Sequence, residues 1–322
     1  MSSNAIPMFS GTHTLAVSLL LCLGSTTSAV AAVAQNECAN PPAGTVFCED
    51  FESANPKSHF DDYDGNPDTE NQIVTNGGPA NSASNKAVRL RVPAAQKGGS
   101  DLIKVLSAGY DKLYARWYFQ YEPGFNFNAL NHGGGLTAGS RDHIGVSGNR
   151  PTGNDFAYLT VQYQDSSATP FAYSYYRGMY QDCSNPNGQC YGDSLPCIYG
   201  SAYCTKPQHR PSVTMPTIQA GRWYCVEQMI DMGTPNATGV NPDGRLALWL
   251  DDQLLGDYQD LWLRTTAALK VQNLWLSLFH HDGTHSAVGE MIDNVVVSTQ
   301  RVSCGSTVTS LLSSPNNLRI VP

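Results

Sequence analysis

The fold is decided by a stretch that begins Gly221-Arg222-Trp223-Tyr224-Cys225-Val226-Glu227-Gln228 and leads, through a loop of Gly, Pro and Asn, into Gly244-Arg245-Leu246-Ala247-Leu248-Trp249-Leu250-Asp251-Asp252. Two runs follow, Leu274-Trp275-Leu276-Ser277-Leu278-Phe279-His280-His281 and Met291-Ile292-Asp293-Asn294-Val295-Val296-Val297. Apolar and other residues alternate along these runs, which is typical of antiparallel strands with one buried face. The stretch predicts an all-β sandwich of two sheets.

Residues 1–34 read as an export signal. A Leu-rich apolar segment runs from Thr14 to Gly24, and Ala32-Val33-Ala34 has the small-x-small pattern that signal peptidase recognises. A membrane anchor is the alternative, but the apolar segment is short and is interrupted by Ser and Thr. We expect a mature chain that begins at Gln35 and is secreted, either to the periplasm or outside the cell.

The cysteine content agrees with export, because an even set remains once Cys22 of the leader is set aside. Proximity in the sequence favours three short pairs and leaves a fourth pair that closes a long loop. The expected pairs are Cys38–Cys48, Cys183–Cys190, Cys197–Cys204 and Cys225–Cys304. A zinc site made from the central four cysteines is the alternative, but their spacing lacks the close pairs of zinc ribbons.

The charge balance excludes two classes of partner. The chain has 27 acidic and 19 basic residues, a formal net charge of −8, and no basic run. We therefore expect neither a nucleic-acid nor a membrane partner. The length suits one large all-β domain over residues 35–304, followed by a tail over 305–322, and we expect a monomer.

Polar turns separate the expected strands. The strands cover residues 46–51, 87–92, 113–121, 157–164, 171–176, 223–232, 245–250, 274–279 and 290–298. Residues 61–85 read as a loop. A second loop, over residues 180–216, carries four cysteines and is either a disulfide-stapled lid beside a groove or a surface insertion.

Alternation sorts each strand into an apolar face and a face of aromatic and hydrogen-bonding residues. The second kind of face carries Tyr114, Arg116, Tyr118 and Gln120, then Tyr158, Thr160, Gln162 and Gln164, then Tyr173, Tyr175 and Arg177, and finally Trp275, Ser277, Phe279 and His281. Aromatic planes stack on sugar rings, while amide and guanidinium groups bind hydroxyls and carboxylates. We interpret these faces as one sugar-binding groove.

The chain resembles the concanavalin-A-like jelly-roll polysaccharide lyases of families fourteen and twenty, which include alginate and glucuronan lyases. The similarity runs from about Phe47 to Ser298. It is clearest at Leu113-Tyr114-Ala115-Arg116-Trp117-Tyr118-Phe119, at Pro123-Gly124-Phe125 and in the runs quoted first. The resemblance implies a β-jelly-roll sandwich of the concanavalin A-like lectin and glucanase type. It also implies a uronate polymer as substrate, cleaved by β-elimination.

Such a reaction needs a base for the proton beside the substrate carboxylate, an acid for the departing oxygen, and groups that neutralise the carboxylate. By position, the Tyr-x-Tyr strand of these lyases falls on Tyr173 and Tyr175, which the resemblance implies are the proton-transfer residues. Their Ser-x-Arg strand falls on Thr160 and Gln162, and the lysine of their Gly-Gly-Lys-Leu loop falls on Gly135. Two positive groups are thus replaced by neutral residues.

His132, which precedes three glycines, joins Tyr173, Tyr175 and Gln162 in the candidate catalytic set. The groups that would replace the missing positive charges are His132, Arg116, Arg141, His143 and His281. Because His280 and His281 point to opposite faces of a strand, alternation selects His281 for the groove. The candidate substrate-binding residues are Arg116, Tyr118, Gln120, Arg141, His143, Tyr158, Thr160, Arg177 and His281.

The resemblance also implies a structural calcium ion and no organic cofactor. In these lyases the ion binds where the first strand, an early loop and the last strand meet. The matching residues are Glu52, Ser82, Asn85 and Asp293. Oxygen ligands of this kind suit Ca²⁺. The alternative is that Glu52 and Asp293 only cap strands.

Three functions remain open. The leading one is a secreted lyase that cleaves a uronate-containing glycan of the alginate or glucuronan kind. A glycoside hydrolase would need two carboxylates facing each other across the groove; Glu227 and Asp231 share a strand face, but no Glu-x-Asp-x-x-Glu pattern occurs. The third is a non-catalytic carbohydrate-binding protein, whose partner would be an acidic or neutral polysaccharide.

Overall fold

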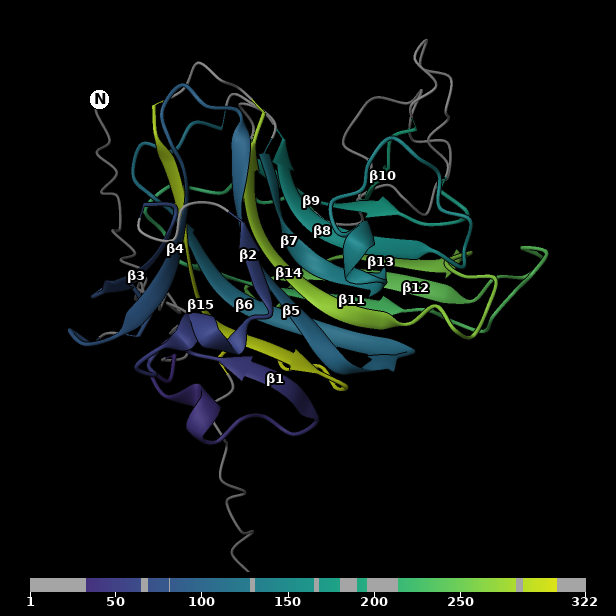
Figure 1. Ribbon diagram of the computed structural model, residues 1–322, viewed down its shortest axis with the longest axis horizontal. Helices are drawn as coiled ribbons and strands as arrows, with labels where there is room; N and C mark the ends of the chain where they lie inside the picture. Colours follow the sequence, from purple (N-terminus) through teal and green to yellow (C-terminus); the bar gives the residue numbers. More distant parts are fainter. Residues whose placement is uncertain are drawn as a thin grey trace, which may run out of the picture. The chain divides into compact units, whose positions relative to one another are not determined.

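The described part of the chain folds into two antiparallel β-sheets that pack against each other (Figure 1). This computed structural model describes residues 33–64, 69–80, 82–127, 131–164, 168–179, 190–195, 214–281 and 286–305. Its strands are β1 (Thr45–Glu49), β2 (Asp62–Asp64), β3 (Asn71–Thr75), β4 (Lys86–Val92), β5 (Gly98–Tyr110), β6 (Lys112–Tyr121), β7 (Asn131–Gly139), β8 (Phe156–Gln164), β9 (Thr169–Tyr175), β10 (Asp193–Leu195), β11 (Tyr224–Asp231), β12 (Gly244–Leu250), β13 (Gln253–Leu261), β14 (Val271–His280) and β15 (Val288–Ser298). Short 3-10 helices cover Glu37–Ala39, Pro56–His59 and Arg141–His143.

One sheet, here called the outer sheet, has the strand order β13-β12-β11-β6-β15-β4-β3, with β1 paired to β15. The other, here called the groove sheet, has the order β10-β9-β8-β7-β14-β5-β2. Strands distant in sequence are neighbours in both, as where β14 pairs with β5 and β7. The predicted all-β sandwich of two sheets is confirmed.

Alternating apolar residues build the core between the sheets. Buried side chains of β6 from the outer sheet and of β14 from the groove sheet belong to one cluster, which includes Leu113, Trp117, Phe119, Leu274, Leu276 and Leu278. Burial of apolar surface of this kind stabilises a fold by about 25 cal/mol per Å². The opposite face of each strand points away from the core, so the groove sheet has an outward face available for binding.

Every strand expected from the sequence is present within a few residues of its predicted bounds. The structure also contains strands that the sequence did not predict. Two of these, β2 and β3, lie in the segment 61–85 that read as a loop, and β5, β7, β10 and β13 were missed as well. Short edge strands and glycine-containing strands carry little alternation, which is the signal that sequence reading depends on.

The glycine-rich strand β7 lies at the centre of the groove sheet, where the resemblance implied a loop. A Cβ atom at Gly135 would overlap the carbonyl oxygen of Leu159, so this position requires glycine. The register against β8 shifts between His132 and Gly135, which adds one residue to β7. Gln228 of the outer sheet is buried and bonds this strand, accepting from Leu136 N at 3.2 Å and donating to the Gly134 oxygen at 3.2 Å.

Two of the expected disulfides are formed, Cys38–Cys48 and Cys225–Cys304. Cys190 is also disulfide-bonded. The other predicted cysteines, Cys183, Cys197 and Cys204, lie outside the described residues. So do nearly all of the predicted export signal, most of the 180–216 loop and most of the C-terminal tail. Within the described residues, no helix has the length and apolar character needed to cross a bilayer.

Candidate active site

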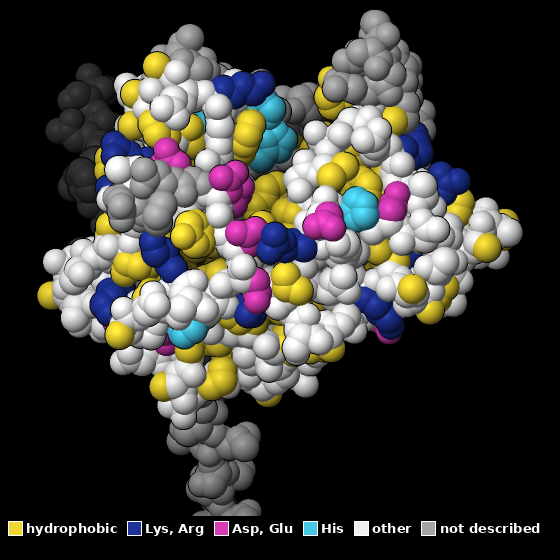
Figure 2. All heavy atoms as spheres, viewed as in Figure 1, with side chains coloured by type: hydrophobic (Ala, Val, Ile, Leu, Met, Phe, Trp, Pro, Cys, Tyr) yellow, Lys and Arg dark blue, Asp and Glu magenta, His cyan; other side chains and the backbone are white. Residues whose placement is uncertain are grey.

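The outward face of the groove sheet is hollowed into a groove of about 860 Å³ (Figure 2). It is lined by residues of β2, β5, β7, β8, β9 and β14, by Tyr191, and by residues of the segment 141–147. Eight of the predicted site residues line it: His132, Arg141, Tyr158, Thr160, Gln162, Tyr173, Tyr175 and His281. The predicted groove therefore exists, and strands β7, β8, β9 and β14 bring together residues that are distant in sequence.

Several of these residues form the floor of the groove and are almost inaccessible to solvent. Tyr158, Thr160 and Gln162 of β8 are at most 5% exposed, and Tyr175 of β9 is 0% exposed. Tyr173 is only partly buried and belongs to the accessible wall. We infer that the floor residues position their neighbours, whereas Tyr173 can contact a bound molecule.

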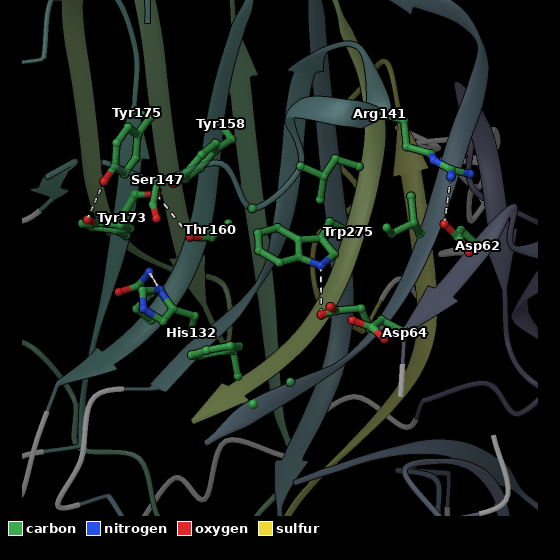
Figure 3. Close-up of a pocket in the computed structure, with 18 of the residues that line it drawn as sticks. Asp62, Asp64, His132, Arg141, Ser147, Tyr158, Thr160, Tyr173, Tyr175 and Trp275 are labelled. Atoms are coloured by element: carbon green, nitrogen blue, oxygen red, sulfur yellow. Dashed lines mark hydrogen bonds and ion pairs between the residues drawn. The ribbon is translucent and has the colours of Figure 1, made fainter. Parts of the chain in front are cut away.

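Backbone groups hold the tyrosine pair. The two hydroxyl oxygens of Tyr173 and Tyr175 are 3.2 Å apart (Figure 3). Tyr175 donates to the Cys190 carbonyl oxygen at 3.0 Å and accepts from Gly148 N at 3.3 Å. Tyr173 accepts from Gly192 N at 3.0 Å. A hydrogen-bond donor aimed at a phenol oxygen stabilises negative charge on it, which suits an oxygen that transfers protons.

Two histidines lie beside the tyrosines and contact each other. Nε2 of His132 lies 2.5 Å from Nε2 of His281. The Gln162 amide bonds Nδ1 of His132 and so directs the ring, with the proton on Nε2. Burial, together with the neighbouring His281, lowers the pKa of His132 to about 3. The pKa of His281 is lowered as well, chiefly by burial, so both rings are neutral at neutral pH.

This pKa shift predicts how stability depends on pH. Unfolded, His132 titrates near 6.5, but folded it titrates near 3, so between these values the unfolded chain binds a proton that the folded chain does not. Its contribution to the free energy of unfolding should therefore fall as pH drops through this window, by up to about 1.4 kcal/mol per pH unit. Urea unfolding from pH 4 to 7 measures this slope. His132→Gln should show a shallower slope, and equal slopes would contradict the assignment.

The other end of the groove is aromatic and acidic. The Trp275 indole of β14 donates to Asp101 Oδ1 at 3.0 Å. Asp64, opposite Asp101 in the β2–β5 ladder, lies near this indole (Figure 3). Arg141 also lines the groove, and its guanidinium is 3.0 Å from the Asp62 carboxylate. Burial raises the pKa of Asp101 to about 6.

Three residues that were predicted to bind substrate lie on the outer sheet, so the prediction is wrong for them. Arg116, Tyr118 and Gln120 belong to β6 of the outer sheet and do not line the groove. Arg116 is buried against Glu37 and donates to the Asn294 carbonyl oxygen, Tyr118 accepts from Gly305 N, and Gln120 donates to the Gly221 oxygen. Alternation finds the face that points away from the core, but both sheets have one, and pairing decides which strand joins which sheet.

Arg177 and His143 are also outside the groove. The Arg177 guanidinium lies over the Trp262 ring at 4.8 Å from its centroid. The His143 ring stacks on Phe156, with centroids 5.4 Å apart. Arg177 lies beyond the end of β9, and His143 lies in the short 3-10 helix Arg141–His143, so strand alternation does not apply to either residue. Of the groups expected to replace the missing charges, His132, His281 and Arg141 alone line the groove in the described residues.

The predicted calcium ligands partly converge at a separate site. The Asn85 amide nitrogen is 2.9 Å from Glu52 Oε1 and 3.1 Å from Asp293 Oδ2. Burial raises the pKa of Asp293 to about 8, and the carboxylates of Glu52 and Asp50 add to the effect. The Ser82 carbonyl oxygen accepts from Asn85 N at 3.1 Å, while the Ser82 hydroxyl lies 3.2 Å from the Ser84 hydroxyl. The described residues contain no cluster of three or more His, Cys, Asp or Glu side chains suited to a metal.

Some residues that line the groove were not predicted from the sequence. Asp101 and Ile103 lie on β5, a strand that was missed, and Tyr63 lies in a segment that read as a loop. Trp275 and Phe279 were placed on the correct face but were not named as site residues. The run of Ser100 to Val105 does not alternate, because two polar residues precede two apolar ones, so it carries no clear signal for β5.

Fold and groove together define an all-β sandwich of the jelly-roll type with a binding face on one sheet. The sequence matches no protein-family model and no curated protein. The structure is similar to an alginate lyase from Chlorella virus, with a TM-score of 0.56 and 12% identity over 80% of this chain and 100% of that one. A PL-14 alginate lyase from Aplysia kurodai has a TM-score of 0.56 and 14% identity, over 80% of this chain and 100% of that one. An endo-β-1,4-glucuronan lyase from Trichoderma reesei has a TM-score of 0.52 and 12% identity, over 81% of this chain and 98% of that one.

At such identities the comparisons establish the fold. The described chain has the jelly-roll fold found in alginate and glucuronan lyases, as its sequence predicted.

Proposed function

We propose that this protein is a secreted polysaccharide lyase that cleaves a uronate-containing glycan by β-elimination. The observation that carries the proposal is the cluster of Tyr173, His132 and His281 at one end of a groove, on the fold of known lyases. The ring centroid of His132 lies 5.7 Å from that of Tyr173 and 4.6 Å from that of His281. Secretion is supported by Cys38–Cys48 and Cys225–Cys304, since disulfides persist in oxidising compartments.

In the proposed reaction Tyr173 transfers the protons. As a phenolate, held by the Gly192 N–H, it removes the proton from the carbon next to the uronate carboxylate. The electron pair of that C–H bond forms the new carbon–carbon double bond while the bond to the glycosidic oxygen breaks. The same phenol then protonates the departing oxygen and returns to its starting state. Tyr175 is a positioning residue, because it is fully buried below Tyr173.

The substrate carboxylate would lie against the paired histidines. Its negative charge next to an imidazole favours the protonated ring, so binding would raise the pKa of the histidine that faces it. The histidine pair would then neutralise the enolate-like charge that develops on the carboxylate as the proton leaves. The two histidines would thus supply the positive charge that the resemblance assigns to a lysine at Gly135 and an arginine at Gln162.

The proposal is tested by incubating the purified protein with alginate, glucuronan, pectate, cellulose and glycans of mixed composition. Formation of an unsaturated uronate is followed by its ultraviolet absorbance. Growth of this absorbance on at least one uronate glycan is the expected result. Reducing ends without unsaturation would indicate a hydrolase, and an absence of products from every glycan would overturn the proposed lyase.

A non-catalytic carbohydrate-binding protein is the second candidate. The supporting observation is that Arg141 is the one Lys or Arg among the described residues of the groove, and it already pairs with Asp62. Retention on an immobilised glycan without any product would favour this function. The hydrolase pair considered from sequence does not serve, because Glu227 lies on the outer sheet and is bonded by Arg301 at 2.9 Å.

We also propose that Glu52, Asn85 and Asp293 hold a structural Ca²⁺ ion. The donor set fits, since two carboxylates meet at one amide. The Asn85 side-chain oxygen accepts from Ala80 N at 2.8 Å and keeps a second lone pair that a cation could use. The ion would tie the segment after β1 to β4 and β15, and would supply no catalytic chemistry.

Removal of this ion should lower the melting temperature. A chelator is expected to decrease it by about 5 °C or more, because an ion at a hundred times its Kd adds about 2.7 kcal/mol. Added Ca²⁺ should restore the value in the wild type but not in Asp293→Asn. Calorimetry with and without chelator makes the measurement, and a melting temperature that is independent of Ca²⁺ would contradict the site.

A further inference from the structure

We propose that the half of the groove around Trp275 binds an uncharged sugar residue, so that the substrate is a mixed glycan in which uronate residues adjoin sugars without carboxylates. This inference rests on the lyase function proposed above and adds the substrate class. It follows from the aromatic surface, the charges and the length of the groove.

The aromatic side chain of Trp275 offers a flat surface at this end. The Trp275 ring is half-buried and is fixed by the bond from its Nε1 to Asp101. Gly145, with φ of +73°, brings the backbone to the ring, since an added Cβ would lie 3.6 Å from its edge. On β2, Tyr63 belongs to the edge of the same groove, but it lies opposite the core residue Leu102, so its ring points to the other side of β2. Aromatic faces of this kind bind the apolar faces of sugar rings.

The charges beside this ring disfavour a second uronate. Among the described residues that line the groove, the acidic ones are Asp62, Asp64, Asp101 and Asp142, and Arg141 is paired with Asp62. Figure 2 shows acidic side chains around the hollow, with a basic group among them. A substrate carboxylate placed here would be repelled. Carboxylate oxygens instead accept hydrogen bonds from sugar hydroxyls, so these groups suit an uncharged ring.

The two ends of the groove contact different residues of the glycan. Trp275 and His281 are six positions apart and point to the same side of β14, which separates them by about 20 Å of extended chain. That distance is longer than one sugar ring. In Figure 3, His132, Tyr173 and Tyr175 lie on one side of Trp275, and Asp62, Asp64 and Arg141 lie on the other.

Binding to the inactive variant Tyr173→Phe tests the inference without any reaction. Calorimetric titration compares two mixed glycans with two uronate homopolymers, all as oligosaccharides of equal length. The mixed glycans are hyaluronan, in which glucuronate alternates with N-acetylglucosamine, and the rhamnogalacturonan backbone, in which galacturonate alternates with rhamnose. The homopolymers are alginate and glucuronan. At low salt we expect at least one mixed oligosaccharide to bind about tenfold or more tightly than either uronate homopolymer. Added salt should narrow this gap, because it screens the repulsion.

Two further variants, made in the same background, separate the causes. Asp64→Asn with Asp142→Asn should tighten homopolymer binding about threefold to tenfold and should change mixed-glycan binding less. Trp275→Leu should weaken mixed-glycan binding severalfold, provided that its melting temperature shows that it folds. Tyr63→Ala is the matched control, because its ring lies on the other side of β2, and it should leave this binding unchanged. Homopolymers that bind as tightly as mixed glycans, or acidic variants without effect on homopolymer binding, would overturn the inference. Loss of the lyase function alone would appear differently, as selective binding in a wild type that forms no unsaturated product.

Discussion

Tyr173→Phe is expected to lower lyase activity by about a thousandfold or more, because it removes the one hydroxyl that both reaches the groove and transfers protons in the proposed reaction. General acid–base catalysis by a positioned group contributes about a hundredfold to ten-thousandfold, and here one group serves two proton transfers. The phenyl ring keeps the volume and the contact with His132, so the fold should be unchanged. The rate of unsaturated uronate formation gives the measurement.

Matched tyrosine variants show whether the effect is specific. Tyr118→Phe removes a hydroxyl on the outer sheet that accepts from Gly305 N, and its rate should stay within about twofold of the wild type. Tyr175→Phe should lower the rate about tenfold to a hundredfold, since this residue holds Tyr173 without touching the substrate. A larger loss in Tyr175→Phe than in Tyr173→Phe would assign the proton transfer to Tyr175 instead.

The second large effect is expected at Gly135, the position on which the resemblance to the jelly-roll lyases places a lysine. Gly135→Lys should destabilise the fold and should not restore a positive charge to the site. A Cβ at this position would overlap the carbonyl oxygen of Leu159 and would lie 2.8 Å from the Thr160 Cα. Backbone atoms in a central strand cannot move aside at low energetic cost. We therefore expect the free energy of unfolding to fall by about 3 kcal/mol or more.

Gly135→Ala should show most of this loss, because the overlap comes from the Cβ atom itself. Gly98→Ala is the control, since an added Cβ there meets no atom within 4 Å. Urea unfolding of the three variants measures the free energies. A stable Gly135→Lys variant with raised lyase activity would show that the backbone of β7 differs from the one described.

The sequence predicted the strands with strong alternation, and it failed where side chains were absent or segments were short. β8 and β14 alternate clearly, and their groove-facing residues were assigned correctly, as the choice of His281 over His280 shows. β7 contains three consecutive glycines, so it has no pattern to read, although Gln228 of the outer sheet specifies it through hydrogen bonds. Such long-range contacts are invisible to a local period.

The candidate site was predicted in part for the same reason. Alternation tells whether a residue points outward, but it does not tell to which sheet the strand belongs, so Arg116 was placed in a groove on the opposite side of the sandwich. The protonation of His132 was also beyond reach, because its pKa depends on burial and on His281, which is 149 residues away in sequence. The acidic end of the groove was missed along with β5 and β2.

The tyrosine pair is held by Gly148 N, the Cys190 oxygen and Gly192 N, all of them main-chain atoms. Any amino acid other than proline supplies the same N–H, and every amino acid supplies the same carbonyl. Both nitrogens nevertheless belong to glycines that the backbone requires, since Gly148 has a φ of +82° and a Cβ at Gly192 would lie 2.6 Å from the Ser174 oxygen. A substitution at either glycine would displace a partner of the hydroxyls, so these two positions limit how far the loops can change in composition over evolutionary time.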